Sequence, residues 1–502
     1  MQITLKERHQ QAAKRLPSVR HLIGERLLDV APGGRWTHVD PSTGQPQAEI
    51  PLATPAELDQ AVAAARKAFP SWRDMAPRKR QDILYRLADL LEQHREELGI
   101  LTTLENGAAH MTADIMTDAG ADWVRYYAGW ADKLVGDVSS HRSENTFIYT
   151  VSEPIGVIGA IITWNGPVMS MGMKIGPALA AGNTVVYKPA ELTPFTALRF
   201  AELAMEAGLP PGVLNIVHGG NDVGAALTSH SGIDKISFTG GPDTARRILA
   251  SAAAMLRPSI LELGGKSANL IFADADLSQA IPISVATCMV NAGQGCSLPT
   301  RMLVEESIYD KVVEQAAAVA AQLQLGDPLL PDTSVGPVIN QAALDRILGV
   351  IDRAKASGAG RLIAGGGRVE SEEHRGGYFI APTVFADVDP ASELAQKEVF
   401  GPVLTITKFR SEAEGIALAN NTQYGLAAYI HGKDHARNTR VAYQLYAGSV
   451  CINGSVAPIH HAPFGGVGIS GFGREGGREG IEEMTYRKSV LVNLGQAHVG
   501  AG

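Results

Sequence analysis

The sequence predicts an α/β protein in which strands pair in parallel and helices connect them. Short apolar runs alternate with helix-like segments between residues 156 and 263, and a second series of the same kind extends from residue 268 to residue 453. Strand, helix and strand at this spacing is the pattern of right-handed βαβ units. With 502 residues, the chain is long enough for two or three domains. A nucleotide-binding sheet is therefore the leading structural expectation.

The first third of the chain is dominated by helical patterns. Thr54, Pro55 and Glu57 combine an N-cap, a proline at the first helical position and a carboxylate that can close a capping box. The helical period continues around residues 79–97. The first 24 residues are basic but contain no continuous apolar segment before a cleavage site, so we expect a surface helix there rather than a signal or transit peptide.

Extended runs follow from residue 146 onward, and each is short enough for a buried strand. A helix with both start and stop signals begins at Thr193-Pro194 and ends before Gly208. The last 17 residues begin with an extended, β-branched run whose free edge could pair with another chain. The predicted strands are residues 146–152, 156–162, 184–187, 213–217, 235–238, 259–263, 268–272, 449–453 and 486–494.

Composition excludes several classes of protein. The chain has 44 Lys and Arg against 52 Asp and Glu, a net charge of −8, which argues against a nucleic-acid binder. Its most apolar stretch, residues 157–187, is interrupted by Gly, Pro and Lys174, so we expect no membrane helix. Three cysteines, an odd number in so long a chain, do not make a disulfide framework. These features predict a soluble protein of a reducing, cytoplasmic compartment.

One cysteine lies in a context that suits chemistry. Cys296 follows an apolar helix-like run and is flanked by Gly, Gln and Ser in the segment NAGQGCS, where backbone N–H groups could face an oxyanion. By contrast, Cys288 and Cys451 lie inside apolar runs and are typical of inert, buried thiols. Context alone leaves Cys296 equally open to being a packing residue, because free cysteines pack more often than they catalyse.

Two further residues are candidates for the same reaction. Glu262 stands between two leucines at the end of a predicted strand, and burial there would raise its pKa toward that of a useful general base. Asn165 follows another apolar strand, and its amide could donate to an oxyanion without titrating. Taken alone, each has a simpler interpretation that is favoured: Glu262 points to solvent at a strand edge, and Asn165 with Gly166 is an ordinary turn pair.

Nine short motifs, taken in their order along the chain, resemble the NAD(P)-dependent aldehyde dehydrogenase superfamily over nearly the whole sequence. They are Glu153-Pro-Ile-Gly-Val-Ile-Gly, Trp164-Asn165, Lys174 with Pro177-Ala-Leu-Ala-Ala-Gly-Asn, Lys188-Pro-Ala-Glu191-Leu-Thr-Pro, Phe238-Thr-Gly-Gly241, Glu262-Leu-Gly-Gly-Lys, Gly293-Gln-Gly-Cys296, Glu398-Val-Phe-Gly-Pro402 and Pro463-Phe-Gly-Gly466.

The resemblance implies three structural parts. A Rossmann-type NAD-binding domain would comprise residues 1–134 and 155–262, and an α/β catalytic domain residues 263–467. A small β oligomerisation flap would combine residues 135–154 with residues 484–502 and join subunits into a homodimer or homotetramer. No nucleic-acid or membrane partner is implied.

The resemblance also implies a mechanism. The Cys296 thiolate attacks the aldehyde, and Asn165 with a backbone N–H holds the oxyanion of the resulting hemithioacetal. Loss of hydride to the nicotinamide leaves a thioester, which Glu262 hydrolyses by deprotonating a water. Lys174 and Glu475 match a proton exit path.

Cofactor positions carry over from the same motifs. Lys188 and Glu191 match the pair that holds the adenosine ribose, and a carboxylate there favours NAD over NADP, which stays possible. Gly240 and Gly241 match the pyrophosphate turn at a helix N-terminus. The remaining cofactor positions implied by the resemblance are Ile161, Trp164, Gly220, Leu263, Glu398 and Phe400.

The channel positions depart from the family pattern. Thr163 and Gly166 replace the Pro and Phe that usually flank Trp-Asn, which predicts a wide, weakly aromatic channel and a bulky or aromatic aldehyde. No extra Arg occupies these channel positions, which argues against a carboxylate-bearing semialdehyde as the substrate. A semialdehyde dehydrogenase and an aliphatic aldehyde dehydrogenase stay as alternatives. A CoA-acylating relative is a further alternative, against which Glu262 argues. The predicted channel residues are Gly166, Ser170, Met173, Ser297 and Pro458.

Two apparent metal motifs have simpler interpretations. His460 and His461 are adjacent on one loop without a ligand cluster, so we interpret them as solvated or channel-lining. Asp274 and Asp276 resemble the start of a calcium loop, but helix capping explains them better. The sequence therefore predicts no metal site.

Overall fold

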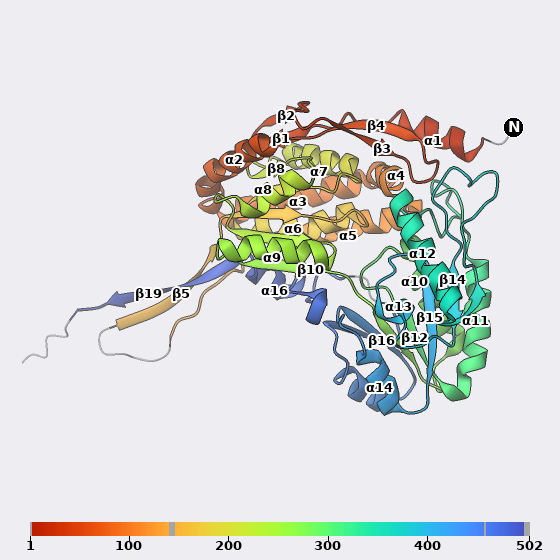
Figure 1. The fold of residues 1–502 in the computed structure, drawn as a ribbon. Coiled ribbons are helices and arrows are strands. Elements are labelled where there is room, and N and C mark those ends of the chain that lie inside the picture. Colours follow the sequence, from red (N-terminus) through yellow and green to blue (C-terminus); the bar gives the residue numbers. More distant parts are fainter. Residues whose placement is uncertain (1–2, 140–145, 456–457, 496–502) are drawn as a thin grey trace, which may run out of the picture.

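The computed structural model describes residues 3–139, 146–455 and 458–495. Two large sheets with their helices stand side by side in Figure 1, and a thin two-stranded arm projects away from them. The predicted α/β class, with parallel strands connected by helices, is confirmed. The predicted boundaries between the cofactor domain, catalytic domain and flap stay predictions, and their residues 1–2, 140–145, 456–457 and 496–502 lie outside the described chain.

The first sheet has eight strands in the order β18-β10-β9-β6-β7-β8-β1-β2. Its five central strands are mutually parallel, and all five were predicted from their apolar runs. The strands β1, β2 and β18 are antiparallel additions at the two ends of the sheet. Each has only two or three residues and is too short for a periodic signal. The bounds are β1 His21–Ile23, β2 Arg26–Leu28, β6 Val157–Ile161, β7 Thr184–Lys188, β8 Leu214–Ile216, β9 Lys235–Thr239, β10 Ser259–Glu262 and β18 Gly471–Phe472.

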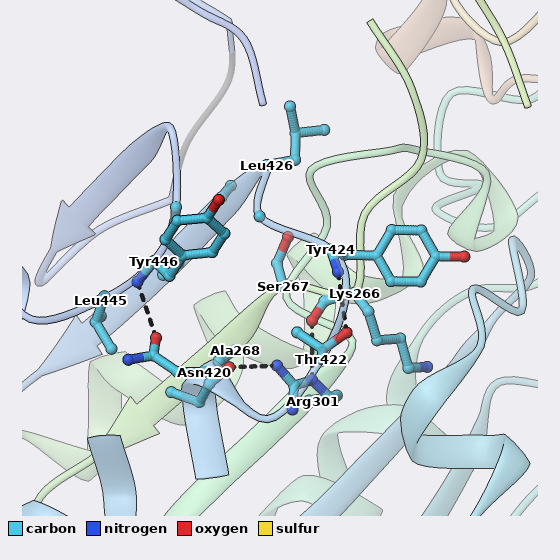
Figure 2. Close-up of a pocket in the computed structure, with 15 residues that line it drawn as sticks. Lys266, Ser267, Ala268, Arg301, Asn420, Thr422, Tyr424, Leu426, Leu445 and Tyr446 are labelled. Atoms are coloured by element: carbon cyan, nitrogen blue, oxygen red, sulfur yellow. Dashed lines mark hydrogen bonds between the residues drawn. The ribbon is translucent and has the colours of Figure 1, made fainter. Parts of the chain in front are cut away.

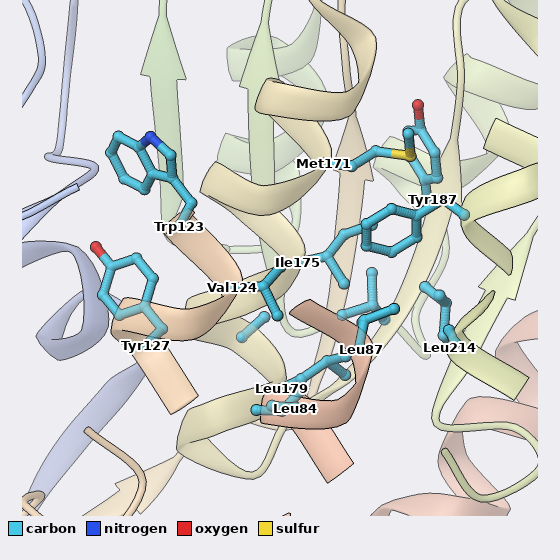
Figure 3. Close-up of a cluster of buried hydrophobic side chains, with 14 of the residues drawn as sticks. Leu84, Leu87, Trp123, Val124, Tyr127, Met171, Ile175, Leu179, Tyr187 and Leu214 are labelled. Atoms are coloured by element: carbon cyan, nitrogen blue, oxygen red, sulfur yellow. The ribbon is translucent and has the colours of Figure 1, made fainter. Parts of the chain in front are cut away.

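Helices pack around this sheet over a large apolar core. Figure 3 shows Trp123, Tyr127 and Ile175 among its buried side chains, where α5 and α6 lie against each other. The predicted capping box at Thr54 and Glu57 is present at the start of α2. The helices are α2 Pro55–Arg73, α3 Pro77–Gln93, α4 Arg95–Asn106, α5 His110–Ala128, α6 Pro167–Ala181, α7 Pro194–Glu206, α8 Asn221–Ser229 and α9 Pro242–Ala254.

The second sheet has seven strands in the order β13-β14-β15-β12-β11-β16-β17, and only β13 is antiparallel to its neighbour. This sheet confirms the second series of strands and helices that the sequence predicts between residues 268 and 453. Its strands are β11 Ala268–Ile271, β12 Arg301–Glu305, β13 Arg361–Ala364, β14 Thr383–Ala386, β15 Val403–Phe409, β16 Ala427–His431 and β17 Ser449–Ile452. Its helices are α10 Leu277–Met289, α11 Tyr309–Gln322, α12 Gln341–Ser357, α13 Glu393–Gln396, α14 Glu412–Asn420 and α15 His435–Ala442.

The projecting arm pairs two segments that are distant in sequence. Strand β5, Thr146–Pro154, runs antiparallel to β19, Thr485–Asn493, and the short helix α16, Gly477–Glu482, precedes β19. The predicted extended run near the C-terminus is confirmed. Phe147 and Leu491 leave apolar surface exposed on the arm. Pairing of subunits through this arm stays a prediction.

The N-terminal segment forms the helix α1, Leu5–Ala13, and then the hairpin β3, Arg35–Val39, with β4, Pro46–Pro51. The expected helix is confirmed, but one side of α1 is buried: His9 lies between the carboxylates of Asp40 and Asp327, at 2.7 and 3.0 Å. Within the described ranges, no helix is long and apolar enough to cross a membrane.

Candidate active site

A cavity of about 430 Å³ lies at the carboxyl ends of the parallel strands of the first sheet. Thr239 ends β9, Glu262 ends β10, and residues 163–166 follow β6 at the same edge. Ligands of open parallel sheets bind at this edge, because loops diverge there. The predicted residues on its wall are Asn165, Gly166, Ser170, Met173, Glu262, Cys296, Ser297, Pro458 and Glu475.

Cys296 reaches the cavity on the loop that follows α10. The backbone turns sharply at Asn291 and Ala292, both with φ of +52°, a left-handed conformation that costs a non-glycine residue about 1–2 kcal/mol. Cys296 is half-buried and lines the cavity. Burial and the nearby carboxylates Glu398 and Glu262 raise the pKa of Cys296 to about 12, so the group is a neutral thiol that needs a base to react.

The other two cysteines differ from each other. Cys288 is buried inside α10, and burial raises its pKa to about 12, as expected for an inert thiol. The prediction that Cys451 is buried is wrong: it is half-buried. The reason is that β17 is the edge strand of the second sheet, which a run of apolar residues does not reveal.

Glu262 is a buried carboxyl group without a local partner. It is 3% exposed, so the alternative of a solvent-facing strand-edge residue is wrong. Neither carboxyl oxygen has a hydrogen-bond partner within the described chain. Burial and the neighbouring Glu475 raise the pKa of Glu262 well above its ordinary value. Such a group is suited to accept and release a proton within the cavity.

Asn165 lies in the turn between β6 and α6. Its Nδ2 donates to the carbonyl of Gln294 at 3.0 Å, and its own carbonyl accepts from Nδ2 of Asn291 at 2.9 Å. A side-chain amide has two N–H donors, so one remains for a group in the cavity. Asn165 is thus tied to the Cys296 loop on both sides.

Lys174 and Glu475 form a buried pair behind Glu262. Nζ of Lys174, on α6, donates to Oε1 of Glu475 at 2.5 Å and to the hydroxyl of Ser237 at 3.1 Å. Glu475 lines the cavity, whereas Lys174 lies one step deeper. The opposing effects of Glu475 and Lys174 on the pKa of Glu262 place all three groups within electrostatic reach of one another.

The predicted adenosine and pyrophosphate positions lie along the same sheet edge. Lys188 ends β7, and its Nζ donates to Oε1 of Glu191 at 3.1 Å. Gly220 and Gly241 are the N-caps of α8 and α9, and a Cβ built on Gly241 would meet nothing within 4 Å. Open space at a helix N-terminus suits the phosphates of a dinucleotide, because N–H groups there bind anions. Ile161, at the end of β6, lies in the same row.

The remaining cofactor positions lie where the two sheets meet. Oε1 of Glu398 accepts from the N–H of Gly265 at 2.9 Å, and burial raises the pKa of Glu398 to about 7. The ring of Phe400 stands perpendicular to Trp164, with centroids 5.5 Å apart. Leu263 donates its N–H to the carbonyl of Ser470 at 3.0 Å. The charge of Glu398 also acts on Cys296, so both sets of residues border one site.

His460, Asp274 and Asp276, the residues of the two apparent metal motifs, contact other parts of the chain. His460 lies against the ring of Tyr126, with centroids 5.1 Å apart. Asp276 is the N-cap of α10 and accepts from the N–H of Ser278, as predicted. Asp274 accepts from the backbone N–H groups of Lys433 and Asp434.

A much smaller cavity of about 10 Å³ lies beside Lys266, the last residue of the Glu262 motif. Figure 2 shows Lys266 and Arg301 among its lining residues. Arg301 donates to the carbonyls of Lys266, Leu418 and Ala419, which ties the motif to α14. Burial and Arg301 lower the pKa of Lys266 to about 8. The space has room for about one water.

Sequence reasoning missed several residues of the site. Asn291 and Gln294 hold Asn165, and Ser237 holds Lys174, through hydrogen bonds. One face of α5 also lines the cavity with residues three to four positions apart, but only the packing of α5 on α6 reveals which face. These residues are Thr112, Ile115, Met116 and Ala119.

Comparison with known proteins agrees with this geometry. The pattern of the aldehyde dehydrogenase family matches residues 31–490. An aldehyde dehydrogenase of Alternaria alternata is 42% identical over 95% of this chain and 96% of its own. A betaine aldehyde dehydrogenase of Cereibacter sphaeroides is 41% identical over 95% and 98%. The crystal structure of a betaine aldehyde dehydrogenase from Staphylococcus aureus in complex with NAD+ superposes with a TM-score of 0.95, at 35% identity, over 99% of both chains.

Proposed function

Because this chain belongs to the aldehyde dehydrogenase family and its reaction is the NAD-dependent oxidation of an aldehyde, we propose that its substrate is a bulky or aromatic aldehyde and that Cys296 captures it covalently. The observation that carries the proposal is one cavity lined by a cysteine, a buried unpartnered carboxyl group and an amide donor. Those are the groups that nucleophilic attack, hydrolysis and oxyanion binding require.

Attack begins with removal of the thiol proton. The raised pKa of Cys296 leaves the thiol protonated at neutral pH, and burial beside Glu398 and Glu262 is the cause. Glu262 lines the same cavity and has free carboxyl oxygens, so it is the base that the chain itself provides. The thiolate sulfur then bonds to the carbonyl carbon, and the carbonyl oxygen becomes an oxyanion.

Asn165 stabilises that oxyanion. One N–H of its amide is held by Gln294, which fixes the direction of the second. Because the donor is oriented before charge develops, little reorganisation is needed. Such a donor lowers the activation barrier by about 2.7–4 kcal/mol. Bound NAD, held by the residues of the sheet edge, supplies the acceptor for the hydride that leaves the tetrahedral carbon.

Hydrolysis of the Cys296 thioester completes the reaction. Glu262 takes a proton from water, whose oxygen bonds to the thioester carbon while the sulfur departs as thiolate. The buried Glu475 and Lys174 lie beside Glu262 and provide the first step of an exit for that proton. This assignment favours a carboxylic acid product over transfer of the acyl group to a thiol.

Lining residues support a bulky, uncharged substrate. A volume of about 430 Å³ is in the range of sites for drug-sized molecules. Phe464 is the one aromatic residue among the described lining residues, and Glu262 and Glu475 are their only charged ones. A substrate carboxylate would find no cation there, and the quaternary ammonium of betaine aldehyde would lack the aromatic cage that cations of that kind prefer.

A panel of aldehydes tests the substrate class. We expect benzaldehyde and larger aromatic aldehydes to have kcat/KM at least about 10-fold above acetaldehyde, because each added apolar group in a fitting pocket contributes about 1–3 kcal/mol. The rate of NADH formation measures this directly. The proposal fails if acetaldehyde, betaine aldehyde or a short semialdehyde has the highest kcat/KM.

Gly166→Phe provides the matched variant for that panel. A Cβ at Gly166 would lie 3.5 Å from Cε of Met169 and 3.6 Å from Sδ of Met116, ordinary contacts that a side chain can tolerate. The new ring would fill the channel. We expect kcat/KM for aromatic aldehydes to fall about 10-fold while acetaldehyde is affected less.

Coenzyme choice is tested at Glu191. Its carboxylate, beside Lys188, would repel the 2′-phosphate of NADP, so NAD should give the higher kcat/KM. Glu191→Gln removes the charge and frees Lys188, and the kcat/KM for NADP should then rise about 10-fold. Parallel titrations of NAD and NADP measure the ratio. An unchanged ratio of kcat/KM for NAD to kcat/KM for NADP in the variant would show that Glu191 does not determine coenzyme choice.

A further inference from the structure

We propose that Asn106 is a positioning residue for the oxyanion site: it holds the turn that carries Asn165. The inference rests on the proposed role of Asn165. Asn106 is the last residue of α4 and is fully buried, although it is polar and lies on a helix outside the cavity lining. A buried amide is retained only where its hydrogen bonds are made, so its partners indicate its role.

The side chain of Asn106 is fixed at both ends of its amide. Its Nδ2 donates to the carbonyl of Trp164 at 3.1 Å, and its Oδ1 accepts from the N–H of Ala108 at 2.9 Å. The second bond belongs to the end of α4, where Gly107 has a φ of +80°. The first crosses to the loop after β6 and is the one that concerns the site.

Trp164 and Asn165 share one peptide plane, and Asn106 holds its oxygen. Because the peptide is planar, fixing the Trp164 carbonyl also fixes the direction of the Asn165 N–Cα bond. The Asn165 carbonyl is fixed by Asn291, and the Asn165 side chain by Gln294. Without Asn106, the Trp164 carbonyl loses its side-chain donor, and the peptide can rotate away from the geometry that aims the Asn165 amide.

The end of α4 also packs against a second loop, which contacts Gln294. A Cβ on Gly336 would lie 2.1 Å from the carbonyl oxygen of Gly107, so the loop that contains Gly336 packs directly on the helix end. Three residues later, the N–H of Ile339 donates to Oε1 of Gln294 at 2.9 Å. Gln294 is the acceptor of the Asn165 amide. The same helix end therefore contacts the loops on both sides of the oxyanion donor.

Glu105 anchors this helix end to the start of α7. Its Oε2 accepts from the N–H groups of Phe195 and Thr196, at 2.9 and 3.2 Å, at the start of α7. Its Oε1 accepts from the hydroxyl of Thr196. Two adjacent buried polar residues thus have different tasks, since Glu105 fixes α4 in the fold and Asn106 fixes the catalytic turn on α4.

A double-mutant cycle with Asn165 tests this inference. Asn165→Ala should lower kcat about 10²–10³-fold, and Asn106→Ala about 10-fold. If Asn106 acts through Asn165, the double variant should resemble Asn165→Ala alone, with KM for NAD unchanged throughout. Losses that multiply in the double variant, or a normal kcat in Asn106→Ala, would overturn the inference. A normal kcat in Asn165→Ala would instead overturn the proposed oxyanion role.

Two further variants separate positioning from general destabilisation. Gln47→Ala is the matched control, because Nε2 of Gln47 donates to the Leu104 carbonyl at 2.7 Å, at the same helix end but away from the turn. Its kcat should be normal. Should Asn106→Ala fail to fold, Asn106→Ser keeps an acceptor for Ala108 and is too short to reach Trp164. It should show the same coupling to Asn165, and additive losses would contradict the inference.

Discussion

Replacement of Cys296 by Ala is expected to reduce kcat for aldehyde oxidation by about 10⁴-fold or more, the largest effect of any single substitution in this protein. No other residue can form the thioester, because Cys288 is buried inside α10 and Cys451 does not line the cavity. Binding of NAD should persist, since none of the proposed cofactor contacts depends on the thiol. NADH formation and NAD titration by fluorescence measure the two effects.

Cys288→Ala and Cys451→Ala are the controls for this loss. Each removes one thiol of the chain and leaves the cavity lining intact. Both variants should keep kcat within about 2-fold of the parent, apart from any loss of stability from the buried Cys288 site. Activity that survives in Cys296→Ala would contradict the assignment of Cys296 as the nucleophile.

Glu262→Gln is expected to have the second largest effect, a fall in steady-state kcat of about 10²–10⁴-fold. Gln keeps the size of the side chain but cannot accept a proton. When the thiol is deprotonated slowly by water instead, the thioester that forms should persist, because its hydrolysis lacks a base. A burst of NADH followed by slow turnover is the expected time course.

The pH dependence follows from the environment of Glu262. Burial and Glu475 raise its pKa well above the ordinary value, so Glu262 is protonated and inactive as a base at low pH. Activity of the parent should therefore rise with pH as Glu262 loses its proton. The variant should lose this rise, because Gln does not titrate. An identical pH profile in both proteins would contradict the assignment.

Glu398→Gln is the matched control for Glu262→Gln. Glu398 is also a buried carboxyl group with a raised pKa, about 7, but it accepts from Gly265 and is assigned to the cofactor side of the site. Its replacement should raise KM for NAD and should not cause a thioester to accumulate. Accumulation in both variants would mean that charge in the site, rather than a base at Glu262, governs hydrolysis.

The parallel core of the fold could be predicted from the sequence because its strands are buried on both faces. Residues 156–162, for example, form an uninterrupted run of apolar residues and glycines and correspond to β6. The short strands β1 and β2 could not be predicted, since three residues give no periodicity. Cys451 was placed wrongly for a related reason, because its strand is buried on fewer sides than its composition suggests.

Some residues of the candidate site could be predicted from the sequence, and others could not. Cys296, Glu262 and Asn165 carry reactive groups in recognisable motifs, and the structure brings them to one cavity. Asn106 has no such signal, because an Asn before Gly at a helix end is typical of a helix terminus. Its bond to Trp164 links residues 58 positions apart and depends on how α4 packs, which no local pattern contains.

Mass spectrometry of quenched Glu262→Gln tests the central claim most directly. After mixing with NAD and an aromatic aldehyde, the peptide that contains Cys296 should gain the mass of the aldehyde less two hydrogen atoms, in step with the burst of NADH. The parent protein should show little of this species at steady state. NADH formation with Cys296 unmodified, or an acyl group on another residue, would contradict covalent catalysis by Cys296.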